Sequence, residues 1–168
     1  MHDEEFDELR LSAFAVAYRM LGSVSEAEDV VQEGFLRLHR VRASGERIES
    51  PRAYLSTVVA RLSLDHLRSA RARRETYVVE WLPEPLVAGA DDPARKAEMA
   101  DSLSLAFLVL LESLSPEQRA AFLLHEVFEE PYDRIAEIIA TSEQNARQLV
   151  SRARRQVEER RPRFEVSR

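Results

Sequence analysis

The stretch spanning residues 131–157, PYDRIAEIIATSEQNARQLVSRARRQV, constrains the fold of this chain more than any other. Isoleucines recur at helical spacing in its first part, after Pro131, which suits the first turn of a helix because it lacks a backbone N–H. The pattern breaks at residues 140–142, where Ser142 is placed to cap a following helix. Two short amphipathic helices separated by so tight a break predict a helix-turn-helix.

The second of these helices has one apolar face and one polar, arginine-rich face. The apolar face consists of Ala146, Leu149, Val150, Ala153 and Val157. The outer face consists of Gln144, Arg147, Gln148, Ser151, Arg152, Arg154 and Arg155. Such a face suits the phosphates and base edges of a DNA groove. An arginine-rich solvent face is also common in helical proteins that bind no nucleic acid, so this stretch by itself leaves both interpretations open.

Composition favours helices throughout the chain. Glycine occurs 4 times in 168 residues, alanine, leucine, glutamate and arginine are plentiful, and no alternating strand pattern is present. With 0 cysteines, disulfides and thiolate metal sites are excluded, and the 4 histidines show no ligand spacing. We expect an all-α protein without cofactor or metal. The lack of a long apolar run or a basic leader predicts a cytoplasmic, non-membrane location.

Charge is segregated along the chain, although its net value is −6. Residues 1–35 hold 9 acidic side chains against 2 arginines, whereas residues 36–75 hold 10 arginines against 4 acidic side chains. Residues 76–130 are acidic again, and residues 131–168 return to basic. Two basic zones separated by an acidic zone predict two contacts with a polyanion.

Two helices are predicted in the first forty residues. The first ends near Gly22, and Ser25 with Glu28 forms a capping box that opens the second. The second helix should bury Ala27, Val30, Val31, Gly34, Phe35 and Leu38. Its opposite face carries Asp29, Gln32, Glu33 and Arg37. A polar stripe of this kind is usually a solvated face, and the functional alternative is a docking surface for a basic partner.

A polar loop is predicted between Val41 and Ser50, followed by a long helix that Ser50 caps and that runs from Pro51 to about Arg74. One face of this helix carries Arg61, Asp65, Arg68 and Arg71. The segment LRSARARR is the densest basic run of the chain. Such a helix can hold phosphates while an adjacent loop holds an unstacked base.

The second half of the chain follows a linker-like stretch, ETYVVEWLPEPLVAGADD, in which Trp81 and Leu82 either pack on a neighbouring domain or await a partner. Helix resumes at Asp92. Ser115 and Gln118 then form a second capping box with proline at the first turn. These helices look like the support for the helix-turn-helix.

Taken together, these segments resemble the extracytoplasmic-function (ECF) sigma factors of bacterial RNA polymerase, and the resemblance covers nearly the whole chain. AYRMLGSVSEAEDVVQEGFLRL is similar to the polymerase-docking part of sigma region 2, and SPRAYLSTVVARLSLDHLRSARARR to its promoter −10 part. LSPEQRAAFLLHEVFEEPYDRIAEIIATSEQNARQLVSRARR is similar to region 4. WLPEP resembles the linker of a subgroup with a C-terminal SnoaL-like regulatory domain, and FEVSR stands about where that absent domain would begin.

The resemblance implies a role for each polar set. Polymerase docking falls to Asp29, Gln32, Glu33, Phe35 and Arg37. Engagement of the melted −10 strand falls to Arg47, Ser50, Arg52, Arg61, Asp65, Arg68 and Arg71. Reading of the −35 duplex falls to Ser142, Gln144, Asn145, Arg147, Gln148, Ser151, Arg152 and Arg155. The linker residues for which it implies a regulatory role are Trp81, Leu82, Pro83, Glu84 and Pro85.

Three positions depart from the family pattern. Ala140 replaces the usual turn glycine, which requires a side chain to accept a less favourable backbone angle or the turn to adjust. Leu62 stands where many members have an asparagine near the −10 strand. Asn145-Ala146 stands where an Ala-Val pair is more usual, so Asn145 either adds a base contact or faces solvent.

The resulting expectation is a two-domain, all-α initiation factor without catalytic chemistry. Region 2 should span residues 1–75, the linker 76–95, region 4 96–162, and a tail towards the missing domain 163–168. The implied partners are core RNA polymerase, through the clamp helices of its largest subunit and the flap of the second largest, promoter DNA, and a C-terminal regulatory domain or an anti-sigma protein. Two alternatives stay open: a stand-alone helix-turn-helix regulator and a helical protein-binding adaptor. The promoter sequence, the inducing signal and the oligomeric state do not follow from the sequence.

Overall fold

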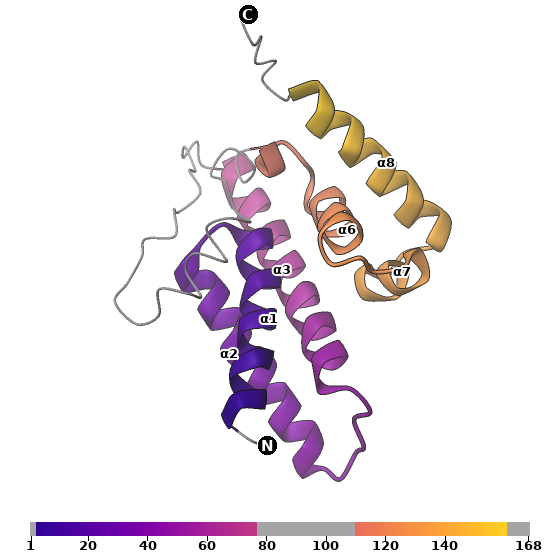
Figure 1. Ribbon diagram of the computed structural model, residues 1–168. Coiled ribbons are helices and arrows are strands. Elements are labelled where there is room, and N and C mark those ends of the chain that lie inside the picture. The colour runs from indigo at the N-terminus through magenta and orange to yellow at the C-terminus, as the bar shows by residue number, and fades with distance from the viewer. Residues whose placement is uncertain (1–2, 77–109, 161–168) are drawn as a thin grey trace, which may run out of the picture. The chain divides into compact units, whose positions relative to one another are not determined.

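The computed structural model describes residues 3–76 and 110–160, and every regular element in these ranges is a helix (Figure 1). The chain divides into two compact units, Met1–Leu103 and Ser104–Arg168. The predicted all-α fold with two helical domains is therefore confirmed. None of the described helices combines the length and the apolar character needed to cross a bilayer.

The first unit is built from α1 (Asp3–Leu21), α2 (Val24–Ala43) and α3 (Pro51–Thr76), and α3 packs against both of the others (Figure 1). Its largest fully buried side chains are Tyr18, Met20, Val30, Leu38, Leu55 and Val59. The predicted buried face of α2 lies in this core, except that Phe35 is only half-buried. Burial of one stripe on each helix leaves the opposite, polar stripes in solvent.

The junction between α1 and α2 differs from its prediction. Gly22 has a φ of 67°, and Ser23 then adopts the extended backbone, φ −128° and ψ 126°, that a capping residue needs. The Ser23 side chain accepts a hydrogen bond from the Glu26 N–H at 3.3 Å. The capping box predicted at Ser25 and Glu28 is therefore wrong, because α2 has already begun at Val24 and Ser25 lies inside it.

The loop before α3 is shorter than predicted. The helix α2 continues to Ala43, so the loop begins at Ser44 rather than at Val41; polar side chains at the end of a helix interrupt the apolar pattern without ending the backbone hydrogen bonds. The Ser44 N–H donates to the carbonyl of Arg40 at 3.0 Å. At the other end, the Ser50 hydroxyl accepts a hydrogen bond from the Ala53 N–H at 3.2 Å, which confirms the predicted cap of α3.

The second unit contains α6 (Pro116–Glu126), α7 (Tyr132–Ile139) and α8 (Glu143–Arg160), and α6 packs against both of the others (Figure 1). The predicted capping box is present: the Gln118 N–H donates to Ser115 Oγ at 3.2 Å, and the Ser115 N–H donates to Gln118 Oε1 at 3.0 Å. Its largest fully buried side chains are Leu111, Leu123, Leu124, Ile135 and Ile138. Arg119, almost fully buried, donates to Glu112 at 2.9 Å.

Several predictions fall on residues outside the described ranges. These are the linker residues Trp81, Leu82, Pro83, Glu84 and Pro85, the start of a helix at Asp92, and the tail at residues 163–168.

Candidate functional site

The turn between α7 and α8 is tight because Ala140 adopts a left-handed backbone, with φ 56° and ψ 54°. This is the conformation for which glycine is usually selected, so the expectation of an unfavourable angle at Ala140 is confirmed. The N–H groups of Ala140 and Thr141 both donate to the carbonyl of Ala136 and close the end of α7. Pro131 lies one residue before α7, as its N-cap, rather than in its first turn.

Ser142 opens α8 as predicted. Its hydroxyl accepts a hydrogen bond from the Asn145 N–H at 3.0 Å, and its carbonyl accepts one from the Ala146 N–H at 2.9 Å. The Asn145 side chain turns back and donates to the Thr141 hydroxyl at 2.7 Å. Ser142 and Asn145 are thus exposed residues whose side chains also hold the turn, which reduces their freedom to reach a base.

The two faces of α8 separate as the sequence predicts. Ala146, Val150, Ala153 and Val157 are buried, and Leu149 is half-buried. The eight residues predicted to read the duplex are all exposed: Ser142, Gln144, Asn145, Arg147, Gln148, Ser151, Arg152 and Arg155. In the described part of the chain, Arg152 and Arg155 form no ion pair. The arrangement brings a continuous polar surface with available guanidinium groups to one side of one helix.

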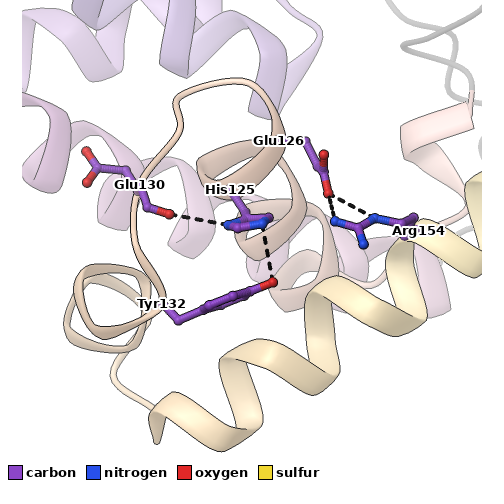
Figure 2. A network of polar contacts seen from close by, with 5 residues as sticks. All are labelled: His125, Glu126, Glu130, Tyr132 and Arg154. Carbon is purple, nitrogen blue, oxygen red and sulfur yellow. Dashed lines mark hydrogen bonds and ion pairs between the residues drawn. The ribbon is translucent and has the colours of Figure 1, made fainter.

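Arg154 behaves differently from the other arginines of α8. Both its Nε and its terminal amino group donate to Glu126 at the end of α6 (Figure 2). Hydrogen bonding to Glu126, together with the attraction of its carboxylate, raises the pKa of Arg154. Sequence periodicity placed Arg154 with the outward-facing set, but its guanidinium ties α8 to α6. The pairing partner lies 28 residues away in the sequence, which periodicity within one helix does not reveal.

Arg147 also has neighbours that sequence patterns did not predict. Its guanidinium lies over the ring of Tyr132, with Cζ 4.5 Å from the ring centroid, and it donates to Glu143 at 2.9 Å. Tyr132 in turn stacks on His125 with a centroid separation of 4.4 Å. The Tyr132 hydroxyl lies 3.2 Å from His125 Nε2, and His125 Nδ1 lies 3.4 Å from the Glu130 carbonyl (Figure 2). Three helices therefore contribute to the surroundings of one exposed arginine.

The residues predicted to engage a melted strand all lie exposed around α3. Arg47 belongs to the loop before α3, Ser50 caps the helix and Arg52 lies in its first turn. Further along α3 the exposed members are Arg61, Asp65, Arg68 and Arg71. Asp65 and Arg68 form an ion pair with a 3.8 Å separation, and both side chains are largely in solvent. Such a pair is weak, so it can be replaced by a phosphate contact.

The predicted docking residues share the solvent side of α2. Asp29, Gln32 and Arg37 are exposed, and Glu33 is half-exposed. Glu33 pairs with Arg37, one turn further on, at 2.9 Å. Phe35 is half-buried and packs against the core cluster of Leu9, Leu38 and Leu55.

Beside this polar face lie two adjoining grooves that sequence patterns did not predict. The larger, of about 350 Å³, is lined by Phe6, Arg10, Phe14, Glu28, Asp29, Val31, Gln32 and Phe35. The second, of about 270 Å³, is lined by Phe6, Gln32, Phe35, Leu36, Leu38, His39 and Arg42. Phe6 and Phe35 lie between them with ring centroids 4.8 Å apart, and Phe6 and Leu36 are large apolar side chains left exposed. Exposed apolar groups rimmed by charges are typical of a surface that binds another protein.

Comparison with known families gives two matches in chain order. Residues 6–73 match Sigma-70 region 2, and residues 104–157 match Sigma-70, region 4. The chain is 50% identical to the ECF RNA polymerase sigma factor SigJ of Mycobacterium tuberculosis, over 94% of this chain and 50% of that protein. It is 30% identical to the ferric citrate uptake sigma factor FecI of Escherichia coli, over 80% of this chain and 76% of that protein.

Solved structures agree with these matches. The crystal structure of Mycobacterium tuberculosis SigJ superposes with a TM-score of 0.75 and 46% identity, covering 93% of this chain and 53% of that one. The sigma factor RpoE of Bartonella quintana, solved in complex with the anti-sigma factor NepR, has the same fold with a TM-score of 0.67 and 22% identity, and 93% of each chain is covered. The chain spans about half the length of the mycobacterial relatives SigJ, SigI and SigG.

Proposed function

This chain belongs to the ECF sigma factors of bacterial RNA polymerase, and from that membership we propose that it directs promoter-specific transcription initiation. It would do so by binding core polymerase in the cytoplasm and recognising promoter DNA at two elements. This function needs no catalytic residue in the chain, because recruitment of polymerase and capture of a DNA strand are binding events.

Core polymerase would dock on the solvent side of α2 and on the grooves beside it. Asp29 and Glu33 offer carboxylates to a basic partner, and the Glu33–Arg37 pair that must open is an exposed pair within one helix, worth about 0.3–0.5 kcal/mol. Phe6, Phe35 and Leu36 supply apolar area next to these charges. An apolar centre with a charged rim is the usual composition of a protein interface, and it fits helices such as those of the polymerase clamp.

The melted −10 strand would be held by α3 and the loop before it. Arginines on one exposed helix face can follow a phosphate backbone, and an irregular loop next to them can accept an unstacked base. The set is Arg47, Ser50, Arg52, Arg61, Asp65, Arg68 and Arg71. Ser50 already caps α3, so we assign it two roles: it helps to position the loop, and it contacts DNA.

The −35 element would be read as a duplex by α8. A recognition helix enters the major groove with its N-terminal part towards the base edges, and the exposed residues from Ser142 to Arg155 line that side of α8. Region 4 would also bind the flap of the second-largest polymerase subunit. The domain limits proposed for these roles are residues 1–75 for region 2, 76–95 for the linker and 96–162 for region 4.

The observation that carries the proposal is that all eight predicted −35 residues are exposed, on the side of α8 opposite its buried row. The net charge of −6 argues that the isolated chain binds DNA weakly, so activity should depend on polymerase. Run-off transcription with purified core polymerase tests this directly. Transcripts from defined start sites only when the chain is added would support it. A tight footprint on a palindromic site without polymerase would favour a stand-alone regulator instead.

A further inference from the structure

We propose that Tyr132 is a positioning residue that holds the Arg147 guanidinium ready to read a base of the −35 element, and that His125 fixes Tyr132 for this task. The inference rests on the proposed function. It concerns one contact near the N-terminal ends of α7 and α8, where Arg147 lies over the Tyr132 ring.

Arg147 is exposed but is held on two sides. Its side chain is 59% exposed, its terminal amino group donates to Glu143 at 2.9 Å, and its Cζ lies 4.5 Å from the centre of the Tyr132 ring. A cation over an aromatic face is attracted by the ring's negative face. An arginine held in advance loses less rotamer freedom when it binds DNA than one that moves freely in solvent.

Arg147 retains N–H donors that its ion pair with Glu143 does not occupy. A guanidinium has five N–H donors in a fixed planar arrangement. Glu143 engages one amino group. The remaining donors can form the paired hydrogen bonds that arginine makes with O6 and N7 of guanine in the major groove.

The Tyr132 ring is itself held in place by His125 of α6. Its hydroxyl lies 3.2 Å from His125 Nε2, and the two rings stack at 4.4 Å with an angle of 19° between their planes (Figure 2). In a neutral imidazole only one nitrogen carries a proton. In the tautomer whose Nδ1–H donates to the Glu130 carbonyl, 3.4 Å away, Nε2 accepts a hydrogen bond from the Tyr132 hydroxyl. The chain of contacts thus runs from the backbone after α6 to Arg147.

Arg147 differs in this respect from the other arginines on α8. Arg154 is held by Glu126 of α6, so its fixation serves packing. Arg152 and Arg155 are exposed and, in the described ranges, pair with no carboxylate and lie over no ring. Arg147 combines an exposed position with a fixed orientation, which is what selective base reading requires of a long side chain.

A double-mutant cycle separates positioning from mere support of the fold. The probe is a duplex enriched from a randomised pool by the wild-type chain bound to core polymerase, with a shuffled duplex of equal composition as reference. The measured quantity is the ratio of the two affinities at one ionic strength. Tyr132→Leu should lower this ratio roughly two- to fivefold, and Tyr132→Phe, which keeps the ring but loses the hydroxyl contact with His125, should lower it less. Against an Arg147→Ala background, Tyr132→Leu should have no further effect on the ratio.

The matched control is the same cycle with Arg155→Ala, where the two effects should simply multiply because Arg155 does not contact Tyr132. Thermal unfolding of each variant reports stability separately. If Tyr132→Leu fails to fold, His125→Ala tests the same step while the Tyr132 ring stays in place. The ratio of the two affinities should then be lower than for the wild-type chain. In the Arg147→Ala background, His125→Ala should not lower the ratio further.

Two results would overturn the inference. One is an unchanged ratio in the Tyr132→Leu or the substituting His125→Ala variant, which includes an equal loss of affinity for both duplexes. The other is a loss of the ratio that persists undiminished in the Arg147→Ala background. If the wild-type complex itself shows a ratio near one, the proposed function fails and the inference with it. A high wild-type ratio without coupling between Tyr132 and Arg147 overturns the inference alone.

Discussion

Gly34 of α2 lies so close to α3 that a Cβ atom added at Gly34 would come within 3.1 Å of the Val59 Cγ2 atom. This close approach lets α2 pack tightly on α3 through the same buried row that holds Val30 and Leu38. Asp29, Gln32 and Arg37 are presented on the solvent side of α2. The small residue at Gly34 thus allows the close packing of the helix that carries the proposed docking surface.

Replacement of Gly34 by valine should destabilise the first unit by about 1–3 kcal/mol, because the added methyl groups overpack the contact with Val59. Chemical denaturation monitored by circular dichroism measures this. Leu36→Val is the control: it places the same β-branched side chain on the same helix at a position that is 46% exposed. Equal stability of the two variants would show that the α2–α3 contact has room to spare.

Replacement of Ala140 by glycine should stabilise the second unit by about 0.5–1 kcal/mol. The left-handed backbone at φ 56° is unfavourable for alanine by about 1–2 kcal/mol, and the extra freedom of glycine in the unfolded chain offsets part of the gain. The melting temperature should therefore rise. Ala70→Gly, inside α3, should lower stability instead, since its backbone is that of a right-handed helix. A lower melting temperature for Ala140→Gly would contradict the assignment of strain to this turn.

Much of the fold could be predicted because helical periodicity carries the information directly. The buried rows of α2 and α8 and the caps at Ser50, Ser115 and Ser142 depend on residues within one turn of each other. The start of α2 could not be chosen in this way. Two overlapping serine–glutamate pairs, beginning at Ser23 and at Ser25, satisfy the same local rule. The turn at Gly22 decides between them.

The contacts around the proposed −35 site were less predictable. Six of the eight candidate residues follow from the polar face of α8, and the family resemblance adds Ser142 and Asn145. The pairing of Arg154 with Glu126 and the stacking of Tyr132 on His125 depend instead on how α6 packs against its neighbours. The grooves beside α2 likewise require Phe6 of α1 to meet Phe35 of α2. Sequence separation hides each of these pairs, and a composition or periodicity argument has no means to recover them.

Glu33→Lys should abolish association with core polymerase while leaving the fold intact. The change reverses the charge at half-exposed Glu33 and places a second positive charge beside Arg37, so a basic partner would be repelled. Gel filtration of the chain with core polymerase measures association, and circular dichroism measures folding. Glu8→Lys, which makes the same change on α1 two residues away from both Phe6 and Arg10, should leave the complex unchanged. A normal Glu33→Lys complex would argue against docking through α2.

Arg155→Ala and Arg154→Ala should have different consequences although the residues are adjacent. Arg155→Ala should weaken binding to −35-containing DNA by about 1–3 kcal/mol if the side chain reads a base, without changing stability. Arg154→Ala should lower stability by less than about 1 kcal/mol, because it removes a partly exposed pair with Glu126. Promoter binding in the presence of polymerase and thermal unfolding measure the two effects. An equal loss on shuffled DNA would reassign Arg155 to a phosphate contact.

Run-off transcription with purified core polymerase tests the central claim most directly. On a library of bacterial promoter fragments, the chain and core polymerase together should yield transcripts from defined start sites that neither component produces alone, and Glu33→Lys should eliminate them. Absence of specific transcripts from a complex that forms normally on gel filtration, or selective DNA binding that needs no polymerase, would contradict the assignment of this chain as an initiation factor.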